Sequence, residues 1–225
     1  MPHFNLGEYL PRTLDSVLAS TYENVEIVVV DDCSTDPLSC LTIERIQTLE
    51  GRIRIIRNPM NLGLAATRNV ALQHVRGEFV LTLDADDLIG PQFIELAVNA
   101  LRRNPAFDFV VPQTGFSSIV RKGRSVDRPP LRITPSSMAR RGRSACTKTA
   151  FPLRPAWRVL ACLRELKYRE ELEAYEDWDL YTRAVAAGKR FIATNGIHFF
   201  YRRVRTRCIT RRSVSRVIVR YIMRC

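Results

Sequence analysis

Residues 79–87 read FVLTLDADD, a largely apolar run that ends in Asp84, Asp86 and Asp87. The run predicts a buried strand, and Leu88–Pro91 are expected to turn the chain after the aspartates. The alternation of side chains at the end of the strand sends Asp84 and Asp86 to the same side. Three like charges within one turn are unfavourable unless a cation compensates them. Carboxylate oxygens suit Mg²⁺ or Mn²⁺, so the segment predicts a divalent cation site. The alternative is a solvated turn in which one Asp caps the helix expected from Pro91.

The composition is that of a globular protein, because 46% of the 225 residues are hydrophobic and 26% are charged. No apolar run approaches the roughly 20 residues of a membrane span, and the N-terminus lacks the features of a signal peptide. The six cysteines include no CxxC pair, which argues against a zinc site and a disulfide framework. We expect one domain over residues 1–206, a basic helix over 207–225 and a cytoplasmic location.

The net charge of +12 is unevenly distributed along the chain. Residues 1–112 carry 9 Lys and Arg against 15 Asp and Glu, a net charge of −6, whereas residues 113–225 carry 26 against 8, a net charge of +18. The basic half can face phosphates, an anionic membrane or nucleic acid. A nucleic-acid-binding protein is disfavoured, because no aromatic residue is interleaved with the Lys and Arg of 121–148.

The expected C-terminal helix has an arginine at every fourth position from Arg212 to Arg224. Like charges at this spacing destabilise an isolated helix, so an anionic partner would stabilise it. We expect a peripheral contact with the anionic inner face of a membrane, and the alternative is a solvated basic face.

Helical and strand-like segments alternate along the first half of the chain. The helical patterns cover residues 8–20, 38–50, 64–75 and 91–103, and the strand-like runs cover 25–31, 53–57, 78–83 and 107–112. This alternation predicts βαβ units and a parallel sheet, an α/β fold. Ligands bind beyond the carboxyl ends of such strands, where Asp31, Asp32 and the aspartates of 84–87 fall. We therefore expect two acidic strand ends to share one crevice.

The second half has weaker patterns. Residues 115–149 are rich in Arg, Lys, Ser, Pro and Gly, which predicts a mobile loop, either a lid or an insertion without a role. Further helices are expected over residues 151–173 and 175–188, and strands over 190–194 and 197–201. Glu176, Asp177 and Asp179 fall in the first turn of the second helix, where acidic residues also stabilise a helix by capping.

Four motifs stand in a characteristic order: VVVDDCSTD at 28–36, NLG at 61–63 followed by ATRN at 66–69, LDADD at 83–87 and EDWDL at 176–180. Together with the opening helix they resemble the inverting, nucleotide-sugar-dependent glycosyltransferases of family 2. The resemblance implies the GT-A fold, a Rossmann-like, mostly parallel sheet flanked by helices. It implies a nucleoside diphosphate sugar as donor, expected to be UDP-linked, and inverting transfer to a hydroxyl of a glycan, lipid-linked or protein acceptor.

The same resemblance implies roles for single residues. Asp86 is the implied direct ligand of Mn²⁺ or Mg²⁺, and Asp84 contacts the ribose or the metal through water. Asp177 is the implied catalytic base, with Glu176 as the fallback. The implied nucleotide-binding residues are Pro2, Asp32, Asn61, Gly63, Arg68 and Asp84. Of these, Asp32 would accept the imide N–H of uracil, and Arg68 would reach the base or the diphosphate.

The chain departs from the family pattern at three places. The family begins with an apolar strand before a Pro-x-Tyr-Asn-like turn, and Pro2–Asn5 is already that turn, so we expect an unpaired side on strand 25–31 and low stability. Cys33 stands where Gly is usual, and residues 160–166 replace a Gly-Gly-Phe-Asp-Glu-like acceptor loop. An inactive fragment is therefore one alternative. A nucleotidyltransferase is another, disfavoured because no Gly-rich loop with a following Lys or Arg closes the first strand.

Overall fold

The computed structural model describes residues 1–48, 51–117 and 157–202. A parallel sheet has the strand order β1-β2-β3, formed by β1 (Pro2–His3), β2 (Ile27–Asp31) and β3 (Ile53–Arg57). A mixed sheet has the order β4-β7-β6-β8-β5, formed by β4 (Phe79–Leu81), β7 (Trp157–Val159), β6 (Phe109–Ser117), β8 (Phe191–Arg202) and β5 (Leu88–Ile89). Among these strands β6 and β8 are parallel, and the other pairs are antiparallel.

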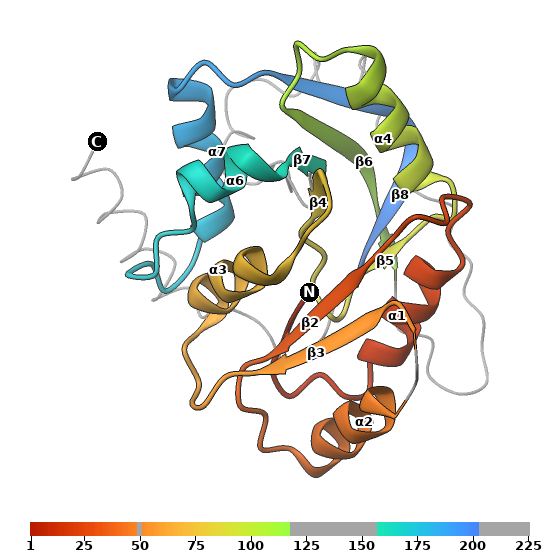
Figure 1. The fold of residues 1–225 in the computed structure, drawn as a ribbon, viewed down its shortest axis with the longest axis vertical. Helices are drawn as coiled ribbons and strands as arrows, with labels where there is room; N and C mark the ends of the chain where they lie inside the picture. The colour runs from red at the N-terminus through yellow and green to blue at the C-terminus, as the bar shows by residue number, and fades with distance from the viewer. Residues whose placement is uncertain (49–50, 118–156, 203–225) are drawn as a thin grey trace, which may run out of the picture.

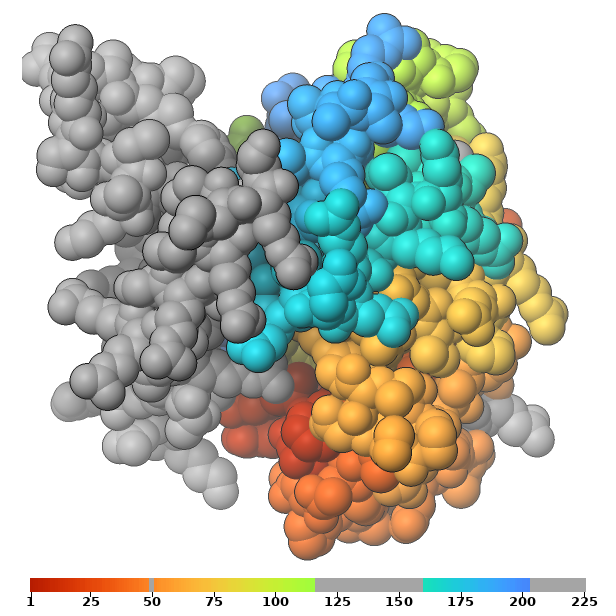
Figure 2. All heavy atoms as spheres, turned by 90° about the vertical axis from the view of Figure 1, so that its left-hand side faces the viewer, coloured from red at the N-terminus to blue at the C-terminus, as the bar shows by residue number. Residues whose placement is uncertain are grey.

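Helices cover both sides of the strands (Figure 1). Their bounds are α1 (Leu10–Leu18), α2 (Pro37–Gln47), α3 (Leu64–His74), α4 (Phe93–Arg103), α6 (Leu160–Leu166) and α7 (Glu176–Ala186). Successive side chains of β2 point to opposite faces of the sheet. Ile27 and Val29 pack in the core with residues of α1 and α4, whereas Val28 and Val30 pack against Ala71 of α3. On the outer face shown in Figure 2, α6 and α7 lie against α3.

The ends of the helices follow from their residues. The side chain of Asp36 accepts a hydrogen bond from the backbone N–H of Ser39 at 2.8 Å, and Pro37 occupies the first turn of α2, where a missing N–H costs nothing. Gly63 precedes α3 with a φ of 86°, a conformation that glycine adopts without strain. The expected helices of the first half are therefore present, each shifted by a few residues at its ends.

Several expectations for the second half, and for the turn after the aspartates, are wrong. Residues 115–117 extend β6, residues 157–159 form β7 instead of a helix, and the helix that follows ends at Leu166. The two expected strands after residue 190 are one, β8, and Leu88–Ile89 form β5 instead of a turn. Cross-strand pairing explains these differences, because β6 is hydrogen-bonded to β8 from Phe109 to Ser117 and local composition does not reveal a partner. The rest of the expected loop over 115–149 and the helix over 207–225 lie outside the described residues.

A cavity of about 470 Å³ lies between β2 and β4. It is lined by residues 25–28 and 77–83, which include parts of β2 and β4, by Ala71 and Leu72 of α3 with Val75 just after it, and by Val17, Ile94 and Val98 of α1 and α4. Met1 lies at its end, where its amine donates a hydrogen bond to the carbonyl oxygen of Val28 at 2.8 Å. Burial lowers the pKa of this amine from 8.0 to about 5. Charged residues, among them Glu26, Glu78 and Arg102, also line this space. Because β1 pairs with Val30 and Asp31 of β2, the side of strand 25–31 that was expected to be unpaired is partly paired.

We predict that an apolar strand of about five to seven residues, joined ahead of Met1, raises the melting temperature. The added strand would fill the cavity and convert the amine into an amide. In the chain that starts at Met1 the unfolded state binds more protons than the folded state between pH 5 and pH 8, so stability is complete above pH 8 and falls as the pH falls towards 5. The extension should also remove this pH dependence. Thermal unfolding at a series of pH values measures both effects.

A Gly-Ser extension of the same length is the matched control. It removes the buried amine without filling the cavity, so it should flatten the pH dependence without the gain from apolar burial. Equal melting temperatures for the two extensions would show that the cavity does not accept a strand.

Candidate functional site

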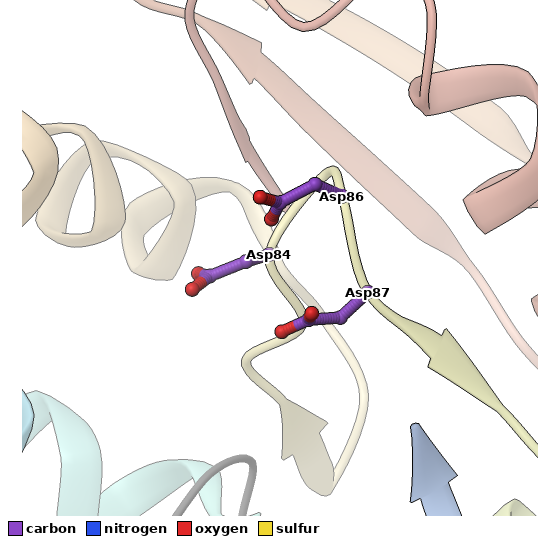
Figure 3. Close-up of side chains that lie close together, drawn as sticks. All are labelled: Asp84, Asp86 and Asp87. Atoms are coloured by element: carbon purple, nitrogen blue, oxygen red, sulfur yellow. The ribbon is translucent and has the colours of Figure 1, made fainter. Parts of the chain in front are cut away.

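Asp84, Asp86 and Asp87 lie on the turn between β4 and β5, and their side chains project to the same side of it (Figure 3). One carboxylate oxygen from each lies within 4.8 Å of the others, and Asp86 and Asp87 are buried. The turn is held by the buried hydroxyl of Thr13, which donates to the carbonyl oxygen of Ala85 at 2.9 Å. A set of convergent, hard oxygen donors of this size fits a divalent cation such as Mn²⁺ or Mg²⁺.

Arg68 of α3 connects this turn to α7. One terminal nitrogen lies 2.7 Å from Oδ1 of Asp84, and the other lies 2.5 Å from Oε1 of Glu176. The guanidinium also lies over the ring of Tyr168, 5.3 Å from its centroid, and the residue is 5% exposed. Burial alone would lower the pKa of Arg68, but the charge of Asp84, with the further effects of Tyr168 and Glu176, raises it well above its usual range. Both of its terminal nitrogens therefore bind carboxylates of the protein itself.

The three acidic residues at the start of α7 have different surroundings, although all are buried. Glu176 is bound to Arg68. Asp179 lies 3.2 Å from Arg169 and 2.7 Å from Arg183 of the same helix, so its carboxylate forms ion pairs, and α7 has no side-chain cap hydrogen bond. The Oδ1 atom of Asp177 accepts a hydrogen bond from the backbone N–H of Trp178 at 2.9 Å.

Asp32 organises the predicted nucleotide-binding loop. Its Oδ1 atom accepts hydrogen bonds from Nδ2 of Asn58 and the backbone N–H of Leu62, both at 2.8 Å, and its Oδ2 atom accepts one from the N–H of Gly63 at 2.9 Å. Asn61 is exposed on the same loop. A carboxylate has about four acceptor positions, so Asp32 keeps capacity for one further donor such as the imide N–H of a base.

A second carboxylate, Asp31, fixes the N-terminal segment beside this loop. Its Oδ1 atom lies 3.0 Å from Nδ1 of His3 and 2.5 Å from Oγ of Ser34, and Arg57 lies 3.3 Å from Oδ2. Pro2 is thereby held at the same edge of the sheet as Asp32, since β1 pairs with the end of β2. No sequence pattern indicated this network, because His3 lies 28 residues from Asp31 and 31 residues from Ser34 along the chain.

The predicted site residues therefore gather at one edge of the molecule, around the carboxyl ends of β1, β2 and β4 and the starts of α3 and α7. Arg202, which the sequence patterns did not single out, donates its backbone N–H to Asp87, and its guanidinium lies over the ring of Tyr9. The assembled site combines a carboxylate cluster for a cation, a loop with backbone and carboxylate groups for a base, and an acidic helix start across from both.

The comparison with protein families agrees with this architecture. Residues 1–156 match the family described as "Glycosyl transferase family 2", which is more than half of the chain. The chain has a GT-A-type fold, as the resemblance implied, and it belongs to glycosyl transferase family 2.

Curated relatives carry the same family assignment. An "Uncharacterized glycosyltransferase" of Haemophilus influenzae is 39% identical over 101 residues, 45% of this chain and 31% of the relative. "Putative glycosyltransferase EpsE" of Bacillus subtilis is 29% identical over 191 residues, 83% of this chain and 66% of the relative. "Putative teichuronic acid biosynthesis glycosyltransferase TuaG" of the same organism is 31% identical over 128 residues, 56% of this chain. The chain spans less than half the length of several of these relatives.

Solved structures with a similar fold include two bound to nucleotide sugars. S. aureus TarS 1–349 in complex with UDP-GlcNAc superposes with a TM-score of 0.67 and 24% identity, covering 90% of this chain and 57% of the TarS 1–349 chain. The mannosyltransferase PcManGT from Pyrobaculum calidifontis, in complex with GDP-Man and Mn²⁺, superposes with a TM-score of 0.72 and 20% identity, covering 99% of this chain and 61% of that enzyme. These likenesses show the fold.

We predict that Arg68→Met lowers the free energy of unfolding by about 3 to 5 kcal/mol, because it leaves the buried Glu176 without its cation. The second change Glu176→Gln should recover part of the loss. Urea unfolding followed by circular dichroism measures both. Arg102→Met is the matched control, since Arg102 and Glu78 form an exposed ion pair at 3.9 Å. A loss no larger than that of the control would contradict the role assigned to Arg68.

Proposed function

We propose that the protein transfers a sugar from a nucleoside diphosphate donor, UDP-linked, to an acceptor hydroxyl with inversion and with the assistance of a divalent ion. The observation that carries this proposal is the junction of three carboxylates, a nucleotide loop organised by Asp32 and an acidic helix start, joined by Arg68. Membership of the family supports it. TarS in complex with UDP and UDP-GlcNAc supports a UDP-linked donor, and PcManGT in complex with GDP-Man makes GDP the base to test against it.

The donor would lie along the carboxyl ends of the strands, with its base on the loop of Asn61 and Gly63 and its diphosphate towards the aspartates. Asp32 would accept the imide N–H of uracil, and Pro2 would line the base. Asp86 would be the direct ligand of Mn²⁺ or Mg²⁺, with Asp84 on the ribose or on the metal through water. A bound divalent ion would supply Lewis-acid neutralisation of the leaving diphosphate.

Arg68 has a different role in this proposal from the one that the family resemblance implied. Because its terminal nitrogens bind Asp84 and Glu176, it would orient the two carboxylates instead of contacting the base or the diphosphate. It would thereby fix the distance between the donor and α7. This assignment makes Arg68 a positioning residue.

Asp177 would be the base. The carboxylate of Glu176 is engaged by Arg68, and that of Asp179 is engaged by Arg169 and Arg183, so these two side chains would orient the site. In the transfer step the acceptor oxygen bonds to the anomeric carbon and gives its proton to the carboxylate of Asp177. The bond from that carbon to the diphosphate oxygen breaks, and the diphosphate leaves with the electron pair.

The acceptor would be a hydroxyl of a glycan, a lipid-linked sugar or a protein. The expected membrane contact through the C-terminal helix concerns residues outside the described part of the chain, and it stays a prediction. Among the residues that the structure describes, no helix has the length and apolar character needed to cross a membrane.

We predict that Mn²⁺ or Mg²⁺ strengthens the binding of UDP, because the ion would link the carboxylates to the diphosphate. Titration calorimetry with the ion and with EDTA measures the difference, and Asp86→Ala should abolish it. GDP in place of UDP tests the base. Equal UDP affinity in both buffers would remove the metal from the proposal, and tighter binding of GDP would reassign the donor.

We predict that Asp177→Asn leaves UDP binding nearly unchanged and lowers the rate of sugar transfer by about 10² to 10⁴, the usual effect of losing a general base. The substitution keeps the shape of the side chain and removes its basicity. Transfer within a few-fold of the unaltered protein would move the role to Glu176. UDP binding without transfer to any acceptor in the unaltered protein would favour an inactive glycosyltransferase-like protein.

A further inference from the structure

Two buried arginines flank the aspartate turn, and they differ in what they bind. Arg68 reaches it from α3 and is held by carboxylates. Arg202 reaches it from the end of β8. The backbone N–H of Arg202 donates to Oδ1 of Asp87 at 3.0 Å, and its guanidinium lies over the ring of Tyr9, 5.0 Å from the centroid. This contact with Tyr9, the residue that precedes α1, fixes the direction of the Arg202 side chain.

The guanidinium of Arg202 keeps hydrogen-bonding capacity that Arg68 has used. Among the residues that the structure describes, it forms no ion pair, although Arg202 is only 7% exposed. A buried cation with remaining donors is stabilised by an anion, and guanidinium binds phosphate oxygens through paired N–H groups.

We propose that Arg202, seated on the ring of Tyr9, is a binding residue for the diphosphate of the donor, beside the cation site of Asp86 and Asp87. This inference rests on the proposed function, because it needs a diphosphate at the aspartate turn. Arg202 supplies a fixed positive charge to the leaving diphosphate in addition to that of the divalent ion. The residue lies outside the motifs of the family resemblance and beyond residues 1–156 of the family match.

The charge of Arg202 has opposite effects on the two ligands. It attracts a diphosphate and repels a divalent cation at Asp86. Arg202→Gln should therefore weaken UDP binding in the presence of Mn²⁺ by about 10- to 100-fold, the range for charge-assisted hydrogen bonds. The same variant should bind Mn²⁺ alone more tightly than the unaltered protein. A residue with a merely structural role would not shift the two affinities in opposite directions.

Titration calorimetry with UDP and Mn²⁺, with Mn²⁺ alone and with uridine makes the test. Arg190→Gln is the matched control, because Arg190 also lies over an aromatic ring, that of Phe107 at 5.5 Å, away from the aspartates. The control should bind all three probes as the unaltered protein does. Arg202→Lys, which keeps the charge without the planar fork, should show a smaller loss for UDP and none for uridine. It also carries the test if Arg202→Gln does not fold.

The outcomes of these titrations distinguish a failure of the proposed function from a failure of the role proposed for Arg202. Failure of the unaltered protein to bind UDP or GDP with Mn²⁺ would remove the proposed function. Normal binding by the unaltered protein and equal UDP affinity in the Arg202 variants would overturn only the role of Arg202. A loss of the same size for uridine and UDP would also overturn it, because a diphosphate ligand cannot act on a nucleoside. The contact between the Arg202 guanidinium and the Tyr9 ring can be tested separately. Tyr9→Phe, which keeps an aromatic ring, should keep the UDP affinity, and Tyr9→Leu, which removes the ring, should lower it.

Discussion

The site depends on the two ion pairs of the buried Arg68 guanidinium, because they join carboxylates that are far apart in the chain. Asp84 lies 16 residues from Arg68 in sequence and Glu176 lies 108 residues away, yet both accept its N–H groups. Without a cation, three aspartates on one turn and an acidic helix start would repel one another across a buried space. The ion pairs of Arg68 offset this repulsion and connect the aspartate turn, on the donor side of the proposed reaction, with α7 on the acceptor side.

The rest of the fold brings Arg68 and its partners to one edge. The parallel pairing of β1, β2 and β3 aligns their carboxyl ends, and α3 starts at the loop that Asp32 holds, so Arg68 in its second turn lies beside the aspartate turn. The antiparallel strands have another task. Because β8 pairs with β5 and ends at Arg202, it places a second arginine against Asp87. The cluster therefore has the guanidinium of Arg68 on Asp84 and the backbone N–H of Arg202 on Asp87, and one oxygen of each aspartate lies within 4.8 Å of the others.

Periodicity made the first half predictable from the sequence, because α1 to α4 and β2 to β4 carry their hydrophobic pattern locally. The aspartate cluster was visible for the same reason, as it follows a strand directly. The strands β7 and β8 were not predictable, since their positions depend on hydrogen bonds to distant partners. The ion pairs of Arg68 and the contact of Arg202 with Tyr9 were also not predictable from the sequence. Both result from tertiary packing, and a side chain that distant segments bury has no local sequence pattern.

In the proposed site the Arg68 bridge holds the aspartates so that they bind a cation in front of a nucleotide diphosphate. An anomalous difference map from crystals grown with Mn²⁺ and UDP tests it most directly. We expect a peak at coordination distance, about 2.1 Å, from the carboxylate of Asp86. We also expect the ion pairs of Arg68 to be unchanged and the diphosphate to lie between the ion and Arg202. A diphosphate bound by Arg68, or Mn²⁺ bound away from Asp86, would contradict it.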